Sequence, residues 1–522
     1  MLEMKLNRAR RKRATGSRQR KLSLPPVPPF YERHPLLVLT LLFVFVLSFG
    51  WWFRSAFFNS ILPGSEPYYH MKISEIVLAK GFTETEFLTG APRHFLLTPF
   101  YVLASNIIYF LGTYSAARLL PPLFSYLSLV LLWALLSLFR ISTRKKFFVC
   151  FSFVISPAFI SLVFLYLPHS FDLFLLLFSV FAIHSRSSFW RLTGLFSSLL
   201  LSASGFSHYA SFVLIVLFML RSRNLLKVPS LSRKKFLHLV LLLSSLSFVA
   251  RFSLFLPKIP FSESLKTLLS AHPLNFQSVL LRSFTIFGAK PGLSLFAVVL
   301  SSIALLQGLK RKKVLAPLYI LSAVLLLLFL FGSGFSLVVL SLLMAFASGF
   351  VIDFFLSRDW SLMVLREFTA WLLVCGLLFA GAVQFSAIIH SRPGPNDVSA
   401  LKDLSLLCSQ KRAVVLSHQD NGFWIEAISD CPSFTDGNAL FFPESEWRLQ
   451  VSERLFRTKE LNTARELLSE FNIGYLLIDE PMKSGKVWSL PDDGLLFLLR
   501  NNETFKREVM YPGIEIWSTD LS

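Results

Sequence analysis

Charged residues are scarce in this sequence. They make up 16% of its 522 residues, against 54% hydrophobic residues, and the mean hydropathy is +0.58. This balance excludes an ordinary soluble protein. Apolar runs recur from Pro35 to about Ile389, and their length of roughly 15 to 21 residues is what an α-helix needs to cross a hydrocarbon core about 30 Å thick. The sequence therefore predicts an integral membrane protein.

Cysteine is also rare, and the four residues of this type include no pair with metal-binding spacing. Cys150 and Cys375 fall within apolar runs and are interpreted as packing residues. Cys408 and Cys431 share the polar C-terminal segment, where they either form a disulfide or remain free thiols. The sequence also has no internal repeat and no charged relay within the apolar runs, which argues against a transporter.

Acidic residues are fewer than basic ones, 31 against 52, and the formal net charge is +21. In a soluble protein this excess would suggest a nucleic-acid partner. Here the basic residues gather at the ends of apolar runs, where they indicate which loops stay in the cytoplasm, so no nucleic-acid partner is predicted. The clusters are the tail 1–34 and the segments 140–146, 186–191, 221–235, 310–313 and 357–367.

An arrangement of eleven membrane crossings places all these clusters in the cytoplasm and the C-terminal segment outside the cell. The run 95–112 must then lie in the outer interface, held by Tyr101 and Tyr109, without crossing. The fold predicted is a polytopic α-helical membrane bundle of about 11–13 transmembrane helices, followed by an extracytoplasmic mixed α/β domain. The predicted crossings are 36–53, 119–139, 147–166, 172–185, 192–205, 206–220, 236–256, 293–309, 314–331, 336–356 and 368–389.

The predicted domains follow from this topology: a basic cytoplasmic tail (1–34), a transmembrane domain (35–389) with external loops at 54–118 and 257–292, and a soluble extracytoplasmic domain (390–522). The protein is expected in the cell membrane, with its N-terminus in the cytoplasm and membrane lipids around it.

Ionisable residues at the outer mouth of a helical bundle are costly unless they meet an ion, another charge or water. Glu66 and His70 lie in the first external loop, His169 and Asp172 at the second, and Glu263 in the third. Carboxylates and imidazoles at one membrane face suit a divalent cation such as Mn2+ or Mg2+. The alternative is structural: Glu66 and Glu263 are solvated loop acids, and His169 and Asp172 cap a helix.

Three motifs resemble the catalytic subunit of archaeal and bacterial oligosaccharyltransferases, which belong to the C-type membrane glycosyltransferase superfamily. The first is "GSEPYYHMKISEIVLAKGF" (64–82), similar to the family's first-loop motif, with Glu66 where the family usually has Asp. The second is "SPAFISLVFLYLPHSFD" (156–172), similar to the approach to the second acidic motif, with "PFSE" (260–263) further on. The third is "SHQDNGFWI" (417–425) followed by "DGN" (436–438), similar to the acceptor-binding segment. The resemblance covers most of the chain.

The resemblance implies transfer of a glycan from a polyprenyl phosphate or pyrophosphate carrier to an acceptor, most often a protein asparagine. Glu66, Asp172 and Glu263 are the implied catalytic residues, and Glu66, Asp172, His169 and His70 the implied ligands of a divalent cation. The implied acceptor-binding residues are Ser417, His418, Gln419, Asp420, Asn421 and Gly422; those implied to bind lipid phosphate are Tyr68, Tyr69, Arg251 and Arg282.

Several positions depart from the family pattern. His418 and Gln419 replace a tryptophan pair, Asn421 replaces a tyrosine, and Gly334 stands where a late helix of the family begins with arginine. Two alternatives therefore stay open: a C-type transferase with another acceptor, such as a serine or threonine hydroxyl, a lipid or a glycan, or a homologue without catalytic activity.

Overall fold

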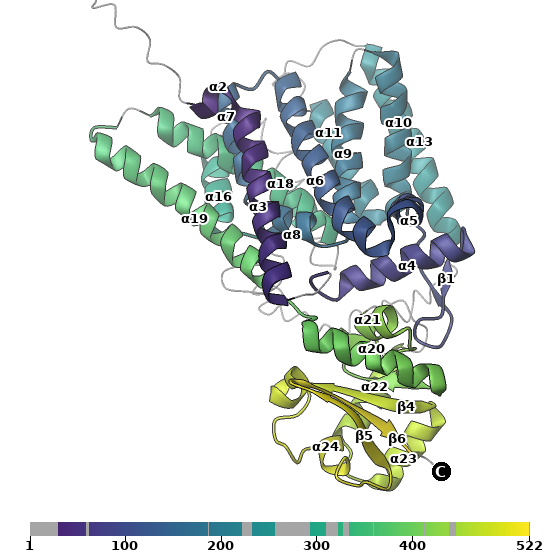
Figure 1. Ribbon diagram of the computed structural model, residues 1–522. Helices are drawn as coiled ribbons and strands as arrows, with labels where there is room; N and C mark the ends of the chain where they lie inside the picture. The colour runs from purple at the N-terminus through teal and green to yellow at the C-terminus, as the bar shows by residue number, and fades with distance from the viewer. Residues whose placement is uncertain are drawn as a thin grey trace, which may run out of the picture.

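The structure is a computed structural model that describes residues 30–58, 62–185, 187–221, 232–255, 293–309, 322–326, 334–358, 360–411, 413–437 and 445–520. Figure 1 shows an upper bundle of long helices and a smaller lower domain built on a sheet. The bundle helices are α2 (Phe30–Arg33), α3 (Pro35–Phe58), α6 (Thr113–Leu138), α7 (Thr143–Val154), α8 (Pro157–Phe164), α9 (His169–His184), α10 (Ser188–Ser204), α11 (Phe206–Arg221), α13 (Ser232–Phe255), α16 (Leu295–Leu309), α18 (Gly334–Ser357) and α19 (Met363–Ile389).

Helices occupy the predicted crossings wherever these fall on described residues; most of 314–331 lies outside them. Within the described part of the chain, four helices are long and apolar enough to cross a membrane, namely α3, α6, α18 and α19, and a fifth span results if α7 and α8 count as one. The shorter helices, including α9 and α16, remain predicted crossings. The predicted fold class is confirmed, because an apolar helical bundle is joined to a mixed α/β domain.

The break between α7 and α8 has a local cause. The two helices meet at an angle of 63°. Pro157 occupies the first position of α8, where its missing N–H costs nothing, and the Ser156 side chain caps the new helix by accepting a hydrogen bond from the Phe159 N–H at 3.2 Å. The apolar run 147–166 therefore bends instead of forming one straight rod.

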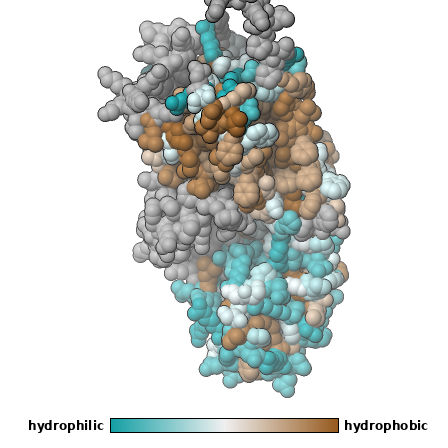
Figure 2. All heavy atoms as spheres, turned by 90° about the vertical axis from the view of Figure 1, so that its left-hand side faces the viewer, coloured by the Kyte–Doolittle hydropathy of each residue, from teal (hydrophilic) through white to brown (hydrophobic). Residues whose placement is uncertain are grey.

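Lipid-facing surface is concentrated on α3 and α19. Large apolar side chains are exposed there, among them Phe45, Trp52, Phe368 and Trp371. Figure 2 shows this hydrophobic zone over the bundle and a mostly hydrophilic surface over the domain below it. Exposed apolar surface of this extent is expected where lipid replaces water as the solvent.

The segment predicted as the first external loop, called the first loop below, folds between the bundle and the lower domain. It contains α4 (Glu66–Lys80), a hairpin of β1 (Thr85–Glu86) and β2 (Arg93–His94), and α5 (Pro99–Leu111). Gly112, with φ of +77°, ends α5 and turns the chain into α6. α5 is thus a helix of 13 residues, and its placement in the outer interface stays a prediction. Tyr109 is exposed on it, but Tyr101, expected at the interface, is buried among α4 and α5 side chains.

A four-stranded sheet with the order β3-β4-β6-β5 forms the centre of the C-terminal domain. Its strands are β3 (Val414–Leu416), β4 (Ile473–Asp479), β5 (Phe505–Tyr511) and β6 (Ile514–Thr519). β3 and β4 are parallel, and the other pairs are antiparallel. Every residue of β4 is buried, because α20 (Pro395–Gln410) packs on one face of the sheet and α22 (Ser445–Arg457), α23 (Leu461–Glu470) and α24 (Leu495–Leu498) lie on the other.

Arg54 joins the bundle to this domain. Its buried guanidinium donates to the carbonyl oxygens of Ile388 at 3.2 Å and Ile389 at 2.7 Å, which end α19, and to Leu62 at 3.1 Å in the first loop. The last carbonyls of a helix have no partner within the helix. One arginine therefore fixes the end of α19, and with it the start of the domain, against the first loop.

Cys408 and Cys431 form a disulfide between α20 and the loop after the π-helical turn η3 (Ile425–Ser429). Replacing both cysteines by alanine is expected to lower the free energy of unfolding of the C-terminal domain by about 3 kcal/mol, because the cross-link removes loop-closure entropy from the unfolded chain. Chemical denaturation followed by tryptophan fluorescence measures this. Reductant should destabilise the parent protein and leave the double variant unchanged; equal stability of both proteins would contradict the expectation.

Candidate active site

His169, Asp172 and His208 form a group of three potential metal ligands at the end of the bundle that faces α4. One ligand atom from each residue lies within 4.8 Å of the others. His169 and Asp172 share one face of the first turn of α9, since residues three apart are neighbours on a helix. His208 comes from the first turn of α11, and its Nε2 lies 3.0 Å from Asp172 Oδ2.

The ligand atoms of this group are not fully satisfied by protein. His169 Nδ1 and Asp172 Oδ1 are buried without a hydrogen-bond partner, and His208 Nε2 has only the contact with Asp172. Buried polar atoms without partners are costly and point to a missing ion or water. Two imidazoles and one carboxylate fit a transition-metal dication better than Mg2+, which prefers oxygen ligands. The residues therefore fit a divalent cation.

The start of α18 shapes one wall of this group. The Phe335 ring stacks on His208 with a centroid distance of 4.2 Å and lies 6.0 Å from the His169 ring. Gly334 approaches His169 so closely that a Cβ there would lie 2.9 Å from its Nε2. Gly334 thus directly contacts the candidate site, and its small size leaves room for the His169 imidazole.

Gly334→Ala is expected to displace the His169 ring and to weaken metal binding by about tenfold or more, because small misplacements of site residues are expensive. Gly334 is the exposed first residue of α18, so the substitution removes no buried side chain and the thermal stability should not fall in parallel. Titration of bound Mn2+ by electron paramagnetic resonance, together with a melting curve, separates the two effects. Unchanged Mn2+ affinity would show that His169 is not a ligand.

His70 reaches the same region from α4. Its Nδ1 lies 2.7 Å from the Tyr101 hydroxyl of α5. Burial, helped by the nearby His169, lowers the pKa of His70 to about 3, so its imidazole is neutral at physiological pH. Because Tyr101 holds Nδ1, Nε2 is the nitrogen left for another partner, an arrangement typical of imidazoles that support a metal centre.

Glu66 and Glu263, the other predicted catalytic acids, do not belong to this group among the residues that the structure describes. Glu66 is the exposed first residue of α4 and is not one of the three ligands within 4.8 Å of one another among the described residues. Glu263 and Arg282 fall in 256–292, outside the residues that the structure describes. The structure thus brings His169 and Asp172 together, places His70 close by, and leaves the assignment of Glu66 and Glu263 as predictions.

The predicted lipid-phosphate ligands have other contacts here. Tyr68 is buried, with its hydroxyl 3.3 Å from the Leu62 carbonyl oxygen. Tyr69 packs against Phe423 of the C-terminal domain. Arg251 pairs with Glu84 at 2.5 Å and donates to the Leu97 carbonyl. Their role in lipid binding stays a prediction.

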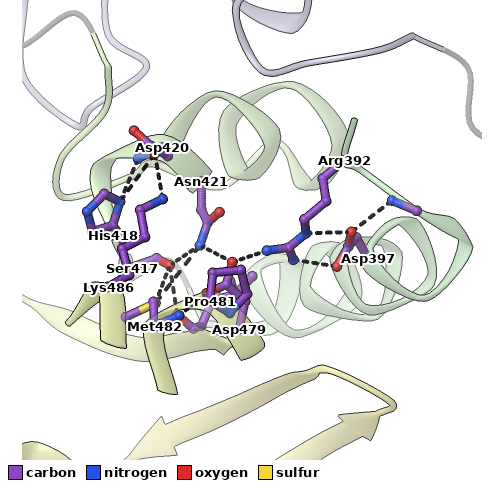
Figure 3. Close-up of polar contacts among 12 residues, drawn as sticks. Arg392, Asp397, Ser417, His418, Asp420, Asn421, Asp479, Pro481, Met482 and Lys486 are labelled. Atoms are coloured by element: carbon purple, nitrogen blue, oxygen red, sulfur yellow. Dashed lines mark hydrogen bonds and ion pairs between the residues drawn. The ribbon is translucent and has the colours of Figure 1, made fainter. Parts of the chain in front are cut away.

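The segment "SHQDNG" divides into an inner and an outer set (Figure 3). Ser417 and Asn421 are buried: the Asn421 amide donates to the Ser417 hydroxyl at 3.0 Å and to Asp479 at 3.2 Å. A Cβ on Gly422 would lie 2.5 Å from the Thr435 carbonyl oxygen. These three residues therefore hold the segment against the sheet.

The outer set is His418, Gln419 and Asp420. The Asp420 carboxylate is half exposed and pairs with Lys486 at 2.5 Å, and the His418 ring accepts the Asp420 N–H. Desolvation, followed by the charge of Lys486, lowers the pKa of His418. If this segment contacts an acceptor, contact through the outer set is the simplest arrangement, and the acceptor-binding assignment of all six residues remains a prediction.

Arg392 fixes the base of this segment. Its guanidinium holds Asp397 with two hydrogen bonds, at 3.0 and 2.6 Å, and also pairs with Asp479. Its charge lies 5.2 Å from the Trp424 ring centre, and the Trp424 indole donates to the Gly64 carbonyl at 3.1 Å. Gly64 directly precedes the Glu66 turn, so the C-terminal domain positions the start of α4.

A second set of buried charges, the Arg93 cluster, joins the first loop to the domain. Arg93 pairs with Glu86 on the hairpin and with Asp436 at 2.6 Å, and all three side chains are at most 1% exposed. Glu426 lies close by, and burial together with Asp436 raises its pKa well above the usual range. Asp436, which matches the family motif, therefore serves here as the counter-charge of a buried arginine.

Sequence reasoning missed His208, Tyr101 and Arg93 as parts of these sites. His208 could have been found from the sequence, because it is an ionisable residue in the first turn of an apolar helix. That helix begins directly after Gly205. The pairing of Arg93 with Asp436 could not be found from the sequence, because the two residues are 343 positions apart in the chain.

Comparison with known proteins shows similarity in structure alone. No family model matches the sequence, and no curated protein matches it. Among solved structures, the chain is similar to the archaeal oligosaccharyltransferase AglB from Archaeoglobus fulgidus in complex with an inhibitory peptide and a dolichol-phosphate, with a TM-score of 0.59 and 12% identity over 94% of this chain and 75% of that one.

Two further structures of the Archaeoglobus fulgidus oligosaccharyltransferase agree. One is tethered to an acceptor peptide containing an NVT sequon, with a TM-score of 0.57, 12% identity and coverage of 94% and 74%. The other contains Zn and sulfate, with a TM-score of 0.57, 13% identity and coverage of 93% and 73%. The chain thus has the fold of the archaeal oligosaccharyltransferase, and the resemblance seen in the sequence motifs is confirmed for the fold.

Proposed function

We propose that this protein is a membrane glycosyltransferase that moves a sugar or glycan from a polyprenyl phosphate or pyrophosphate carrier to an acceptor. The observation that carries the proposal is the group His169, Asp172 and His208, with its unsatisfied buried ligand atoms at the end of the bundle beside the first loop. The similar archaeal enzyme, which has been solved with a dolichol-phosphate and with an acceptor peptide, supports a lipid-linked donor.

The residues of the site have distinct roles in this proposal. Asp172, His169 and His208 hold a divalent cation, most suitably Mn2+, and Tyr101 orients His70 beside them. The cation would supply positive charge for the phosphate oxygens of the leaving carrier. Glu66, at the exposed start of α4, and Glu263 are proposed to act on the acceptor side, where carboxylates accept hydrogen bonds from the acceptor nucleophile.

The topology proposed places the site outside the cytoplasm. The basic segments 140–146 and 357–367 flank the ends of α7 and α19 that lie away from the C-terminal domain in Figure 1. Because basic loops stay in the cytoplasm, the C-terminal domain, α4 and the candidate site would all face the exterior of a cell membrane.

Protein asparagine is the acceptor that the fold favours, but the inner set of "SHQDNG" suggests a second possibility. Since the Asn421 amide donates to Ser417 and Asp479, and the Ser417 hydroxyl donates to the Leu477 carbonyl oxygen, these two side chains are not available to an acceptor. A hydroxyl acceptor on a protein, a lipid or a glycan is therefore the alternative.

The test is an assay of the full-length protein in membrane vesicles with a polyprenyl-linked sugar, added Mn2+ and a peptide containing Asn-X-Thr. Release of lipid phosphate together with a glycosylated asparagine supports the asparagine reaction. Metal-dependent release without peptide glycosylation supports another acceptor. The absence of any release with several polyprenyl-linked sugars would contradict transferase activity.

A further inference from the structure

A cavity of about 680 Å³ opens in the C-terminal domain, at the end farthest from the membrane bundle. It lies between α24, the loop that follows η5 (Met482–Lys486) and the edge of the sheet formed by β5 and β6. Its lining includes Lys483, Asn502, Arg507, Glu515 and Trp517. No part of the candidate active site contributes to it.

The cavity exists because the helical cover of the sheet is incomplete. On β6, Ile514 and Ile516 are buried toward α20, so Glu515 and Trp517 project from the opposite face. That face is covered over β4 by α22 and α23, as the buried cluster around Leu476 and Ile478 shows. This cover extends over the start of β5, where Phe505 is fully buried, but it is incomplete over β6, where Trp517 remains only partly buried.

The polar side chains in the cavity are arranged around Trp517. Its indole N–H donates to Glu515 at 3.0 Å, and the other Glu515 oxygen pairs with Lys483 at 2.6 Å. The Arg507 guanidinium lies 5.6 Å from the Trp517 ring centre. Glu515 is thus neutralised from within the cavity, while Arg507 is held over the ring by a cation–π contact that leaves its N–H groups available.

The cavity wall carries more basic than acidic side chains. Four of its lining side chains are basic, namely Lys483, Arg500, Lys506 and Arg507, and two are acidic, namely Glu480 and Glu515. Lys483 pairs with Glu515, Arg500 with Asp492 and Lys506 with Glu508, so Arg507 is the basic side chain in the best position to receive an anion. A volume within the range of about 300–1,000 Å³ is that of a small-molecule site, and a planar guanidinium recognises carboxylate or phosphate oxygens.

We propose that this cavity binds an acidic saccharide. An arginine recognises its carboxylate or phosphate, the Asn502 amide is suited to hydroxyl groups, and Trp517 together with Leu496 supplies apolar surface for the sugar ring. A purely inorganic anion would leave the aromatic and apolar side unused, and a neutral sugar would leave the positive charge unused. The proposal does not depend on the transferase activity.

Isothermal titration of the full-length protein in detergent with tri-galacturonic acid tests this assignment, with maltotriose as the neutral sugar of equal length and inorganic phosphate as the free anion. Tri-galacturonic acid is expected to bind at least tenfold more tightly than either. Arg507→Gln should weaken its binding at least tenfold, whereas Arg457→Gln, which changes an exposed arginine on α22, should leave it unchanged.

Trp517→Phe provides a second variant that keeps an aromatic residue on β6 and is expected to weaken binding by a smaller factor. Equal binding of maltotriose or of phosphate, equal losses in the Arg507 and Arg457 variants, or no binding of tri-galacturonic acid by the folded protein would each overturn the proposal.

Discussion

Asp172→Asn is expected to lower metal-dependent release of lipid phosphate by about a hundredfold to a thousandfold. The amide keeps the shape of the side chain but removes the negative charge that, with two neutral imidazoles, holds a dication. Bound Mn2+, measured by electron paramagnetic resonance, should be lost in parallel. Since Asp172 is a buried carboxylate with one unsatisfied oxygen, the thermal stability should stay equal or rise, as is common at functional sites.

The matched control is Asp430→Asn. Asp430 is an exposed carboxylate on the same side of the bundle, paired with Lys72, and its φ of +55° is one that asparagine tolerates. The release of lipid phosphate by the Asp430→Asn variant should stay within about twofold of that by the parent protein, in line with the small effects of surface substitutions. His208→Gln should follow Asp172→Asn. If Asp172→Asn retains both Mn2+ and turnover, the three-ligand group is not the metal site.

Arg93→Met is expected to weaken the contact between the first loop and the C-terminal domain by about 3–5 kcal/mol, because it leaves buried carboxylates without their counter-charge. Glu86, Asp436 and Glu426 would then share a site that is closed to water. Hydrogen–deuterium exchange of the hairpin 85–94 and of 433–437 measures the free energy of local opening directly. Arg457→Gln, at an exposed ion pair, should change it by less than about 0.5 kcal/mol.

The effect of Arg93→Met should also depend on pH. Burial raises the pKa of Glu86 and of Glu426 in the folded protein, so the folded state binds more protons than the unfolded state and stability falls as pH rises. Removing the arginine strengthens this tendency, so the loss should be larger at pH 8 than at pH 5. Combining Arg93→Met with Glu86→Gln and Asp436→Asn should recover part of the lost stability, because the buried negative charges are then removed together with the arginine. A loss that is independent of pH would mean that the cluster acts through packing alone.

Local features of the fold were predictable because their causes lie within a few residues. The apolar runs became helices, since length and hydropathy are properties of a continuous segment. A helix also occupies the run 95–112, as α5. The disulfide between Cys408 and Cys431 was one of two possibilities left open.

The candidate site was only partly predictable. His169 and Asp172 share a helical turn, so their proximity follows from spacing alone. The third member, His208, lies on another helix, and its position depends on how α9, α10 and α11 pack. Tyr101 was not predicted correctly for the same reason. The sequence predicted an interfacial tyrosine, but the structure buries Tyr101 against α4.

By itself, the sequence determined that this is a membrane protein with a soluble domain after its last helix, and it indicated the fold through short motifs. Only the tertiary structure decided which polar residues meet: His208 with Asp172, Gly334 with His169, and Arg93 with Asp436. The physical reason is that helix formation and lipid burial act along neighbouring residues, whereas contacts between elements arise from side-chain packing among segments tens to hundreds of residues apart.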